Sequence, residues 1–240
     1  MVGVDGAVEA GSSLTPSSSG QQQFWKSPNS IFNFGFHSVG NDGLYILGIS
    51  INGTSDGTPV WTAGENGGIR VGDKASCNFQ NDGNLVLRNG TNTTVWQTNT
   101  ANQSISSAVM QDDGNFVLKN SSSNIVWESF ANPTDTLLVN QNFSVGQSLH
   151  MDPYSFTLEP SGNFTLKWRN NITYWNQGAT NGSRLHLSSQ GIFTLYNSSD
   201  DQLWIAYSSD YADSTITLRK IRLESDGNLR SYGWSKSSGS

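Results

Sequence analysis

Short hydrophobic runs alternate with polar turns along the whole chain. Residues 85–87, 116–118 and 192–195 are such runs, and they are flanked by Gly, Asn, Asp and Ser. Apolar residues at period two between turn-forming residues are typical of β-strands. No window of ten or more residues shows the spacing of an amphipathic helix. The pattern therefore predicts an all-β fold.

The strands and turns recur as one repeated unit. Residues 80–96 read QNDGNLVLRNGTNTTVW, and residues 111–127 read QDDGNFVLKNSSSNIVW, 31 positions later. A period between about 20 and 50 residues indicates a repeated structural unit. In four copies a glycine lies 13 residues before a tryptophan: Gly83 and Trp96, Gly114 and Trp127, Gly162 and Trp175, and Gly191 and Trp204.

Two further copies are incomplete. The copy around Gly227 has no tryptophan at this interval before the chain ends at Ser240. The first copy, in residues 29–36, has Ser30 in the glycine position, and Trp61 follows 31 residues later, which implies an insertion of 18 residues. The six copies fall into two groups of three, separated by residues 129–142, which contain Pro133 and no repeat.

Three copies in each group predict two tandem threefold modules, in which each copy forms a small sheet and the tryptophans pack near the axis. We expect an N-terminal extension over residues 1–20, a first module over residues 21–145 and a second over residues 146–240. The tryptophans expected to be mostly buried are Trp61, Trp96 and Trp127 in the first module and Trp175 and Trp204 in the second.

Composition and charge exclude several classes of function. Only 13% of the residues are charged and the net charge is −6, with no basic stripe, which argues against nucleic acid as a partner. No apolar run approaches the roughly 18–20 residues of a membrane helix, and the first 20 residues lack the features of a signal peptide. Cys77 is the only cysteine, so no intrachain disulfide is expected.

Catalytic and metal-binding motifs are also missing. His37, His150 and His186 lie in unrelated sequence contexts, and no G-x-S-x-G, H-E-x-x-H or C-x-x-C motif occurs. We therefore expect no enzyme activity, no cofactor and no metal site.

Ten N-x-S/T sequons indicate a secreted glycoprotein of the extracellular space, the cell wall or the apoplast. They lie at Asn52, Asn89, Asn92, Asn102, Asn120, Asn142, Asn163, Asn171, Asn181 and Asn197. The alternative is that a chain rich in Asn, Ser and Thr contains them by chance.

The repeat resembles the bulb-type (monocot mannose-binding) lectin family, whose motif is Q-x-D-x-N-x-V-x-Y. Residues 11–36 resemble the mature start of plant lectin receptor kinases and of secreted epidermis-type glycoproteins. VWESFANPTDTLL at 126–138 is similar to the junction after the first lectin module of S-domain proteins, and IRLESDGNLRSYGW at 221–234 to the end of the second. The resemblance implies two tandem threefold β-prisms of the bulb-lectin type.

The family motif points to two sugar sites in the first module. The matching residues are Gln80, Asp82, Asn84 and Val86, and Gln111, Asp113, Asn115 and Val117, with Arg88 and Lys119 in place of the family tyrosine. Alternate strand residues share a face, amides and carboxylates supply the donors and acceptors that sugar hydroxyls need, and valine offers apolar contact to the ring. A third, weaker candidate in the second module comprises Asp226, Asn228 and Tyr232.

Two functions compete on this reading. One is a secreted plant lectin that binds mannose-containing glycans or cell-wall polysaccharide through the first module, with an affinity on the order of 0.1–10 mM per site. The other is an extracellular recognition or structural glycoprotein, or the ectodomain of an S-domain receptor kinase, whose sugar sites are vestigial and which binds a protein or self-associates as a homo-oligomer. Asp-Gly turns also serve hairpin geometry, which favours the second reading.

Overall fold

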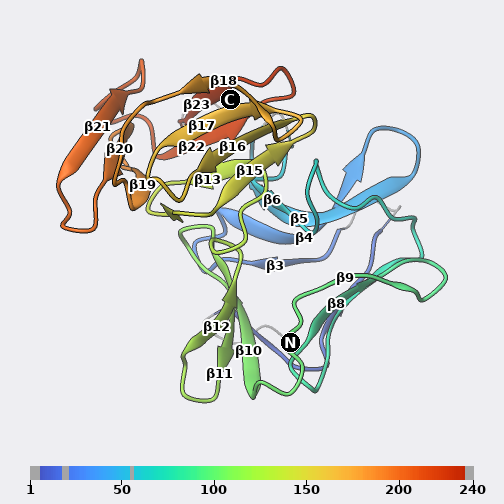
Figure 1. Ribbon diagram of the computed structural model, residues 1–240. Helices are drawn as coiled ribbons and strands as arrows, with labels where there is room; N and C mark the ends of the chain where they lie inside the picture. Colours follow the sequence, from blue (N-terminus) through green and yellow to red (C-terminus); the bar gives the residue numbers. More distant parts are fainter. Residues whose placement is uncertain (1–5, 18–21, 55–56, 236–240) are drawn as a thin grey trace. The chain divides into compact units, whose positions relative to one another are not determined.

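The computed structural model describes residues 6–17, 22–54 and 57–235 (Figure 1). All regular elements in these ranges are β-strands, which confirms the all-β prediction. The chain divides into two compact units. Unit 1 comprises Met1–Asn52 and Gly57–Ala131, and unit 2 comprises Gly53–Asp56 and Asn132–Ser240.

Unit 1 consists of three four-stranded antiparallel sheets. One contains β3 (Phe24–Lys26), β4 (Phe32–Val39), β5 (Leu44–Ile51) and β6 (Trp61–Thr62). The next contains β2 (Ser13–Leu14), β7 (Ser76–Phe79), β8 (Leu85–Arg88) and β9 (Thr94–Gln97). The last contains β1 (Ala7–Glu9), β10 (Ile105–Met110), β11 (Phe116–Asn120) and β12 (Ile125–Glu128). Each sheet holds one sequence repeat, as the threefold prism predicts.

Unit 2 repeats this plan with one difference. Its four-stranded sheets contain β15 (Ser148–Met151), β16 (Tyr154–Leu158), β17 (Phe164–Trp168) and β18 (Ile172–Asn176), and β14 (Asn142–Ser144), β19 (Arg184–Leu187), β20 (Ile192–Tyr196) and β21 (Gln202–Tyr207). The remaining sheet has three described strands, β13 (Thr136–Leu138), β22 (Leu218–Leu223) and β23 (Leu229–Trp234).

The expected N-terminal extension is part of the first prism, so this boundary was wrong. Strand β1 pairs with β10 and strand β2 with β7, in registers that set Val8 opposite Ala108 and Leu14 opposite Cys77. The side chains of Val8 and Leu14 are buried in the core. The repeat pattern concealed this because each edge strand is distant in sequence from its sheet. Residues 1–5 and 18–20 of the expected extension lie outside the described residues.

The expected boundary between residues 145 and 146 was placed too late for the same reason. Unit 2 begins at Asn132. Strands β13 and β14, which come before residue 146, pair with β22 and β19 of unit 2. In both units the three leading strands therefore join the third, second and first repeat in that order.

The conserved turn of each repeat requires a left-handed backbone conformation. Gly83, Gly114, Gly162, Gly191 and Gly227 have φ between 80° and 93°, and Ser30 in the degenerate copy has φ 59°. Glycine adopts such angles without steric cost. A Cβ atom on Gly83 would also lie 2.7 Å from Cβ of Ile105. The glycine is thus needed for both the turn and the packing behind it.

Tryptophans meet in unit 1 as the repeat predicts. The ring centroids of Trp61, Trp96 and Trp127 are 5.7–6.0 Å apart, in edge-to-face contacts. Trp61 is 5% exposed, whereas the other two are half-buried. In unit 2 the expectation of burial was wrong for Trp175, which is 42% exposed, and Trp204 is half-buried. Only these two copies in unit 2 supply a tryptophan, so the cluster lacks its third member.

Candidate functional site

The first motif lies on the turn that leads into β8. The Gln80 amide donates to the carbonyl of Asn84 at 2.8 Å, and the Gly83 amide donates to the carbonyl of Gln80 at 3.0 Å. Within this turn, Oδ1 of Asp82 accepts a hydrogen bond from the Asn84 amide at 3.0 Å. An aspartate that caps its own turn in this way fixes the local backbone. The turn thereby brings the side chains of Gln80 and Asp82 to the same end of the sheet.

Asn84 holds the sheet together through its side chain. Its Nδ2 donates to Oε1 of Gln97 at 3.0 Å. Its Oδ1 accepts from Oγ1 of Thr98 at 3.1 Å and from the Thr100 amide at 3.2 Å. Asn84 is buried, and a buried amide with both ends satisfied stabilises the fold. These contacts, 13 to 16 residues further along the chain, were not foreseen from the sequence.

The second motif has the same construction. Oδ1 of Asp113 accepts from the Asn115 amide at 2.9 Å. Nδ2 of Asn115 donates to Oε2 of Glu128 at 2.6 Å, and Oδ1 accepts from Oγ of Ser129 and from the Phe130 amide, both at 3.1 Å. The shared spacing of Asn84 to Gln97 and of Asn115 to Glu128 is the signal in the sequence that could have revealed this network.

The two valines are not available to a ligand. Val86 is 2% exposed and Val117 is 0% exposed. Val86 lies between Asn78 on β7 and Gln97 on β9, its partners in the register of the sheet. The expected apolar contact between these valines and a sugar ring is therefore wrong for this conformation, because neighbouring strands cover both side chains.

A polar groove of about 470 Å³ lies beside the first motif. Gln80 and Arg88 line it together with Ser76 and Asn78 of β7 and with Asn92 of the next hairpin. One N–H of the Arg88 guanidinium donates to the carbonyl of Asn92 at 3.3 Å. Ser76 and Asn78 were missed by the sequence analysis, although their alternation on β7 marks them as residues of one face.

The second motif has less polar surroundings. Gln111 is half-buried and Asp113 is exposed, as are Gln80 and Asp82 in the first copy. The repeat offset of 31 sets Val109 at the position of Asn78. The neighbouring side chain therefore offers no hydrogen bond at this copy.

The third candidate is occupied by its own side chains. Both carboxylate oxygens of Asp226 accept from the Arg230 guanidinium, at 2.8 and 2.6 Å. The Arg230 guanidinium, followed by Asn228, holds the pKa of the Asp226 carboxyl well below its usual range. Nδ2 of Asn228 donates to Asp226 at 3.0 Å, and the Tyr232 hydroxyl donates to Oε1 of Glu224 at 2.7 Å. The residues predicted at this copy come together, but they satisfy one another.

The asparagines of the ten sequons all lie on accessible surface. Six are exposed, and these are Asn52, Asn92, Asn102, Asn142, Asn171 and Asn181. The other four, Asn89, Asn120, Asn163 and Asn197, are half-buried. Asn92 also lines the polar groove, so a glycan at this position would stand at its rim.

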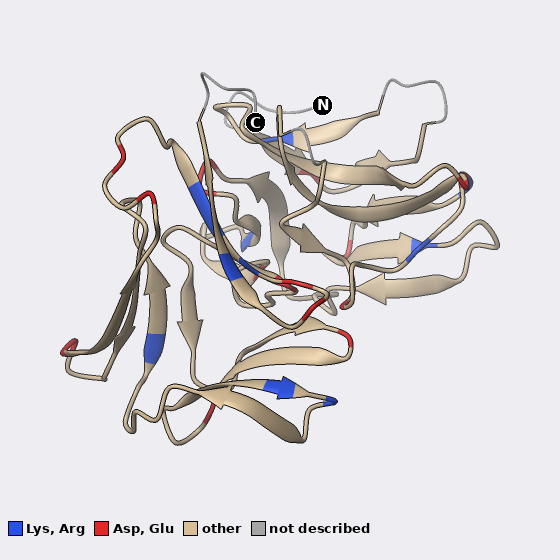
Figure 2. Ribbon diagram, turned by 90° about the horizontal axis from the view of Figure 1, so that it is seen from above, with Lys and Arg blue, Asp and Glu red and all other residues tan. Residues whose placement is uncertain are grey.

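Charged residues are sparse on both units. Figure 2 shows Lys and Arg at separated positions along the ribbon, with Asp and Glu between them. In the described ranges, no group of three or more His, Cys, Asp and Glu side chains could hold a metal ion. The same ranges contain no helix with the length and apolar character needed to cross a membrane.

Known plant proteins share this sequence. A G-type lectin S-receptor-like serine/threonine-protein kinase of Arabidopsis thaliana is 38% identical over 222 residues, which cover 89% of this chain and 26% of the kinase. A second Arabidopsis kinase of that description is 34% identical over 258 residues, covering 96% of this chain and 32% of the kinase. The chain thus spans about a third or less of the length of these relatives.

Solved lectin structures align with less than half of the chain. A lectin from Allium sativum is 28% identical, with a TM-score of 0.37 over 42% of this chain and 99% of that lectin. The mannose-specific agglutinin from snowdrop bulbs, solved with methyl-α-D-mannoside, is 19% identical, with a TM-score of 0.37 over 43% and 96%.

A family model is matched in the part of the chain that holds both complete motifs. Residues 58–152 match the model described as D-mannose binding lectin. This span includes the turns at Gln80 and Gln111, and the kinases that resemble the chain carry the lectin type in their names. The chain therefore belongs to the bulb-type, D-mannose-binding lectin family.

Proposed function

We propose that unit 1 binds mannose-type glycans weakly through the surface formed by Gln80 and Asp82 and through its repeat at Gln111 and Asp113. The observation that carries this proposal is the polar groove of about 470 Å³ beside Gln80. The exposed Asp82 uses Oδ1 to cap its turn, so its second oxygen can accept from a sugar hydroxyl. Charge-assisted hydrogen bonds of this kind are stronger than neutral ones.

The first copy is the better of the two sites. Asn78 and Ser76 add amide and hydroxyl groups to its groove, whereas Val109 takes the place of Asn78 in the second copy. Asn84 and Asn115 do not contact the sugar in this proposal, because their side chains are bonded within the sheets. With few hydrogen bonds at an open site, each copy binds on the order of 0.1–10 mM.

Arg88 and Lys119 give the sites a character of their own. Neither side chain can accept a hydrogen bond, so neither replaces the family tyrosine as an acceptor. Arg88 lines the groove next to Gln80, where a cation favours an anionic group on a ligand. The groove thus accommodates a uronic acid of a cell-wall polysaccharide as well as a neutral mannose.

The proposed setting is the plant cell surface or apoplast. All ten sequon asparagines are exposed or half-buried, which is the placement that glycosylation requires. The kinases that resemble this chain are named as receptor-like proteins. A glycosylated, secreted lectin unit agrees with both observations.

The second candidate function is recognition of a protein. The motif asparagines serve the fold in both copies, so the motif would persist without a sugar. The chain also matches about a third or less of each receptor-like kinase. In this case the units belong to an S-domain receptor ectodomain that binds a protein or pairs with itself.

A glycan array separates the two functions. The wild-type chain is compared with the double variant Asp82→Asn and Asp113→Asn, because asparagine keeps an Oδ1 that caps the turn and removes the charge. Asp226→Asn is the matched control, since its turn has the same Asx geometry. The proposal predicts binding to mannose-rich glycans or uronic acids by the wild type and the control, and at least a tenfold loss in the double variant. Equal binding by all three chains would refute these sites, and no binding by any would favour protein recognition.

A further inference from the structure

One sheet of unit 2 lacks the strand that carries the tryptophan in every other sheet. In the other five sheets this strand is β6, β9, β12, β18 or β21, and it forms the edge of a four-stranded sheet. The sheet of the Gly227 repeat has the order β13-β22-β23, and within the described ranges β23 pairs with β22 alone. One edge of β23 therefore presents backbone groups that are paired in the equivalent strands.

The register of the other repeats defines where the absent tryptophan belongs. Trp96 lies opposite Leu87, four residues after Gly83, and Trp175 lies opposite Leu166, four residues after Gly162. Trp127 and Trp204 follow the same rule with Leu118 and Leu195. The residue four positions after Gly227 is Ser231. A tryptophan on an added strand would consequently lie opposite Ser231.

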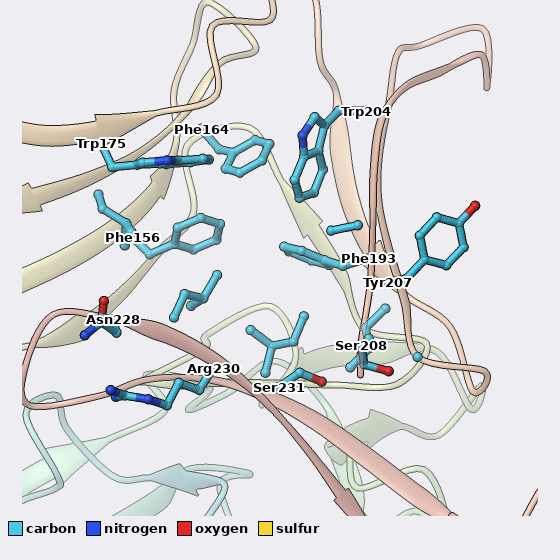
Figure 3. A pocket seen from close by; sticks show the side chains of 16 residues that line it. Phe156, Phe164, Trp175, Phe193, Trp204, Tyr207, Ser208, Asn228, Arg230 and Ser231 are labelled. Atoms are coloured by element: carbon cyan, nitrogen blue, oxygen red, sulfur yellow. The ribbon is translucent and has the colours of Figure 1, made fainter. Parts of the chain in front are cut away.

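An apolar cavity of about 370 Å³ occupies this place. Figure 3 shows Trp175, Phe164 and Trp204 along one side and Asn228, Arg230 and Ser231 of the β23 hairpin along the other. The Phe164 ring centroid is 5.5 Å from that of Trp175 and 5.0 Å from that of Trp204. In unit 1 the corresponding tryptophans close on a third indole at 5.7–5.8 Å. In unit 2 that third place is the cavity.

Exposure of aromatic side chains marks the same opening. Trp175 and Tyr207 line the cavity, and they are 42% and 58% exposed. A large aromatic side chain contributes strongly to binding when it is desolvated. An added strand that covers Trp175 would give it the burial that Trp61 has in unit 1.

We infer that this cavity and the open edge of β23 form an acceptor site for an extended peptide segment that carries a tryptophan. The segment adds to the sheet as a fourth, antiparallel strand, and its indole enters the cavity opposite Ser231. In such strand addition, main-chain hydrogen bonds give affinity and a side-chain pocket gives specificity. The occupant is a peptide rather than a free aromatic molecule, because the cavity and the strand edge adjoin at β23.

The test uses a synthetic peptide that copies residues 201–208 (DQLWIAYS), the tryptophan strand of the preceding repeat. It is titrated into the whole chain by calorimetry, beside the same peptide with its tryptophan replaced by alanine. A third peptide carries N-methyl groups on alternate backbone amides, so it keeps the indole but cannot pair along a strand. Free indole is the small-molecule probe.

We expect saturable binding of the tryptophan peptide, with at least tenfold weaker binding of the alanine peptide, the N-methylated peptide and indole. The variant Ser231→Trp fills the cavity from β23 and should abolish binding, whereas the control Ser199→Trp, on an exposed hairpin, should bind as the wild type does. Far-UV circular dichroism checks that each variant is folded.

Several results would overturn the inference. Equal affinity for the tryptophan and alanine peptides would remove the role of the cavity, and equal affinity for indole and the tryptophan peptide would remove that of the strand edge. Failure of the wild-type chain to bind the tryptophan peptide would reject the site. If sedimentation shows a dimer that the peptide dissociates, the occupant is a second copy of the chain and the assignment to a peptide partner fails. The comparison of peptides remains decisive if Ser231→Trp does not fold.

Discussion

Asn84 donates a hydrogen bond from its side-chain amide to Oε1 of Gln97 at 3.0 Å, across two strands of one sheet. The repeat makes the same bond from Asn115 to Glu128 at 2.6 Å. In unit 2, Oδ1 of Asn163 accepts from the Gly178 amide at 2.9 Å, although this copy keeps no other residue of the motif. The asparagine of the family motif is therefore a structural residue here, and ligand binding is left to the glutamine and the aspartate.

This division of roles predicts that Asn84→Ala destabilises unit 1 whereas Gln80→Ala does not. Loss of the Asn84 amide leaves Gln97, Thr98 and Thr100 without one partner each. Such losses in a buried network should lower the free energy of unfolding by about 2–3 kcal/mol. Gln80 takes part in the turn through its backbone, so its alanine variant should stay within about 0.5 kcal/mol.

Urea unfolding of the two variants measures this difference. Calorimetric titration with mannoside should give the reverse order, with Gln80→Ala losing sugar affinity at unchanged stability. Equal stability of the two variants would show that the Asn84 network contributes little.

A second prediction compares tryptophans at equivalent positions of the two units. Trp61 is 5% exposed and touches two other indoles, whereas Trp175 is 42% exposed. Trp61→Ala should cost about 3–5 kcal/mol of unit stability, as large-to-small changes in cores do. Trp175→Ala should cost about 1–2 kcal/mol, because less area returns to water. Thermal unfolding of both variants tests the ranking, and an equal loss would mean that Trp175 is packed as tightly as Trp61.

The fold could be predicted from the sequence because the repeat encodes it locally. Gly83 and Gly114 supply turns with positive φ, and the constant interval to Trp96 and Trp127 sets the strand pairing. The pairing of Val8 with Ala108 could not be predicted in this way, since nothing in residues 7–9 repeats. Long-range partners of short edge strands leave no periodic signal, and both domain boundaries were misplaced for that reason.

The candidate site was predictable only in part. The motif identified the turn residues Gln80 and Asp82 correctly as neighbours on one hairpin. It did not reveal that Val86 is covered, because burial depends on the side chains of the two adjacent strands. Nor did it reveal Asn78, which reaches the groove from another strand of the sheet. Sequence patterns report on one strand at a time, whereas a groove is formed by several.

A third prediction concerns pH. Burial lowers the pKa of His37 from its ordinary value of 6.5, and a hydrogen bond with the Gly48 carbonyl opposes this effect only in part. The ring stacks on Phe24 at 5.3 Å, and its Nε2 lies 3.2 Å from that carbonyl, so the neutral ring donates from Nε2. Because the unfolded chain takes up a proton first, this contribution to stability is complete above pH 6.5 and is lost as the pH falls through the lower pKa of the folded state.

The variant His37→Gln isolates this effect. Glutamine can donate to the same carbonyl but does not titrate, so the difference in melting temperature between wild type and variant should shrink as the pH falls from 7 to 5. A difference that stays constant across this range would contradict the assignment of His37 as a buried neutral histidine.

A fourth prediction links glycosylation to the groove. Asn92 lines the groove next to Arg88, and its sequon ends at Thr94. In chain produced by a eukaryotic host, Thr94→Val removes this glycan and leaves Asn92 in place, so it should strengthen sugar binding severalfold. Thr91→Val, which removes the Asn89 sequon, is the control for an altered hairpin. Peptide mapping after enzymatic deglycosylation verifies occupancy, and unchanged binding on loss of an occupied Asn92 glycan would contradict its place at the rim.

The central claim is that the first two repeats of the chain bind sugar through a glutamine and an aspartate on one turn. A nuclear magnetic resonance titration of the ¹⁵N-labelled chain with methyl α-mannoside, and in parallel with glucuronate, tests it most directly. The account predicts saturable shifts of the side-chain amide signals of Gln80 and Gln111 in the millimolar range, larger at Gln80, with no shift of Asn228, whose amide donates to Asp226. Shifts confined to other residues, or no shift at Gln80 with either sugar, would contradict it.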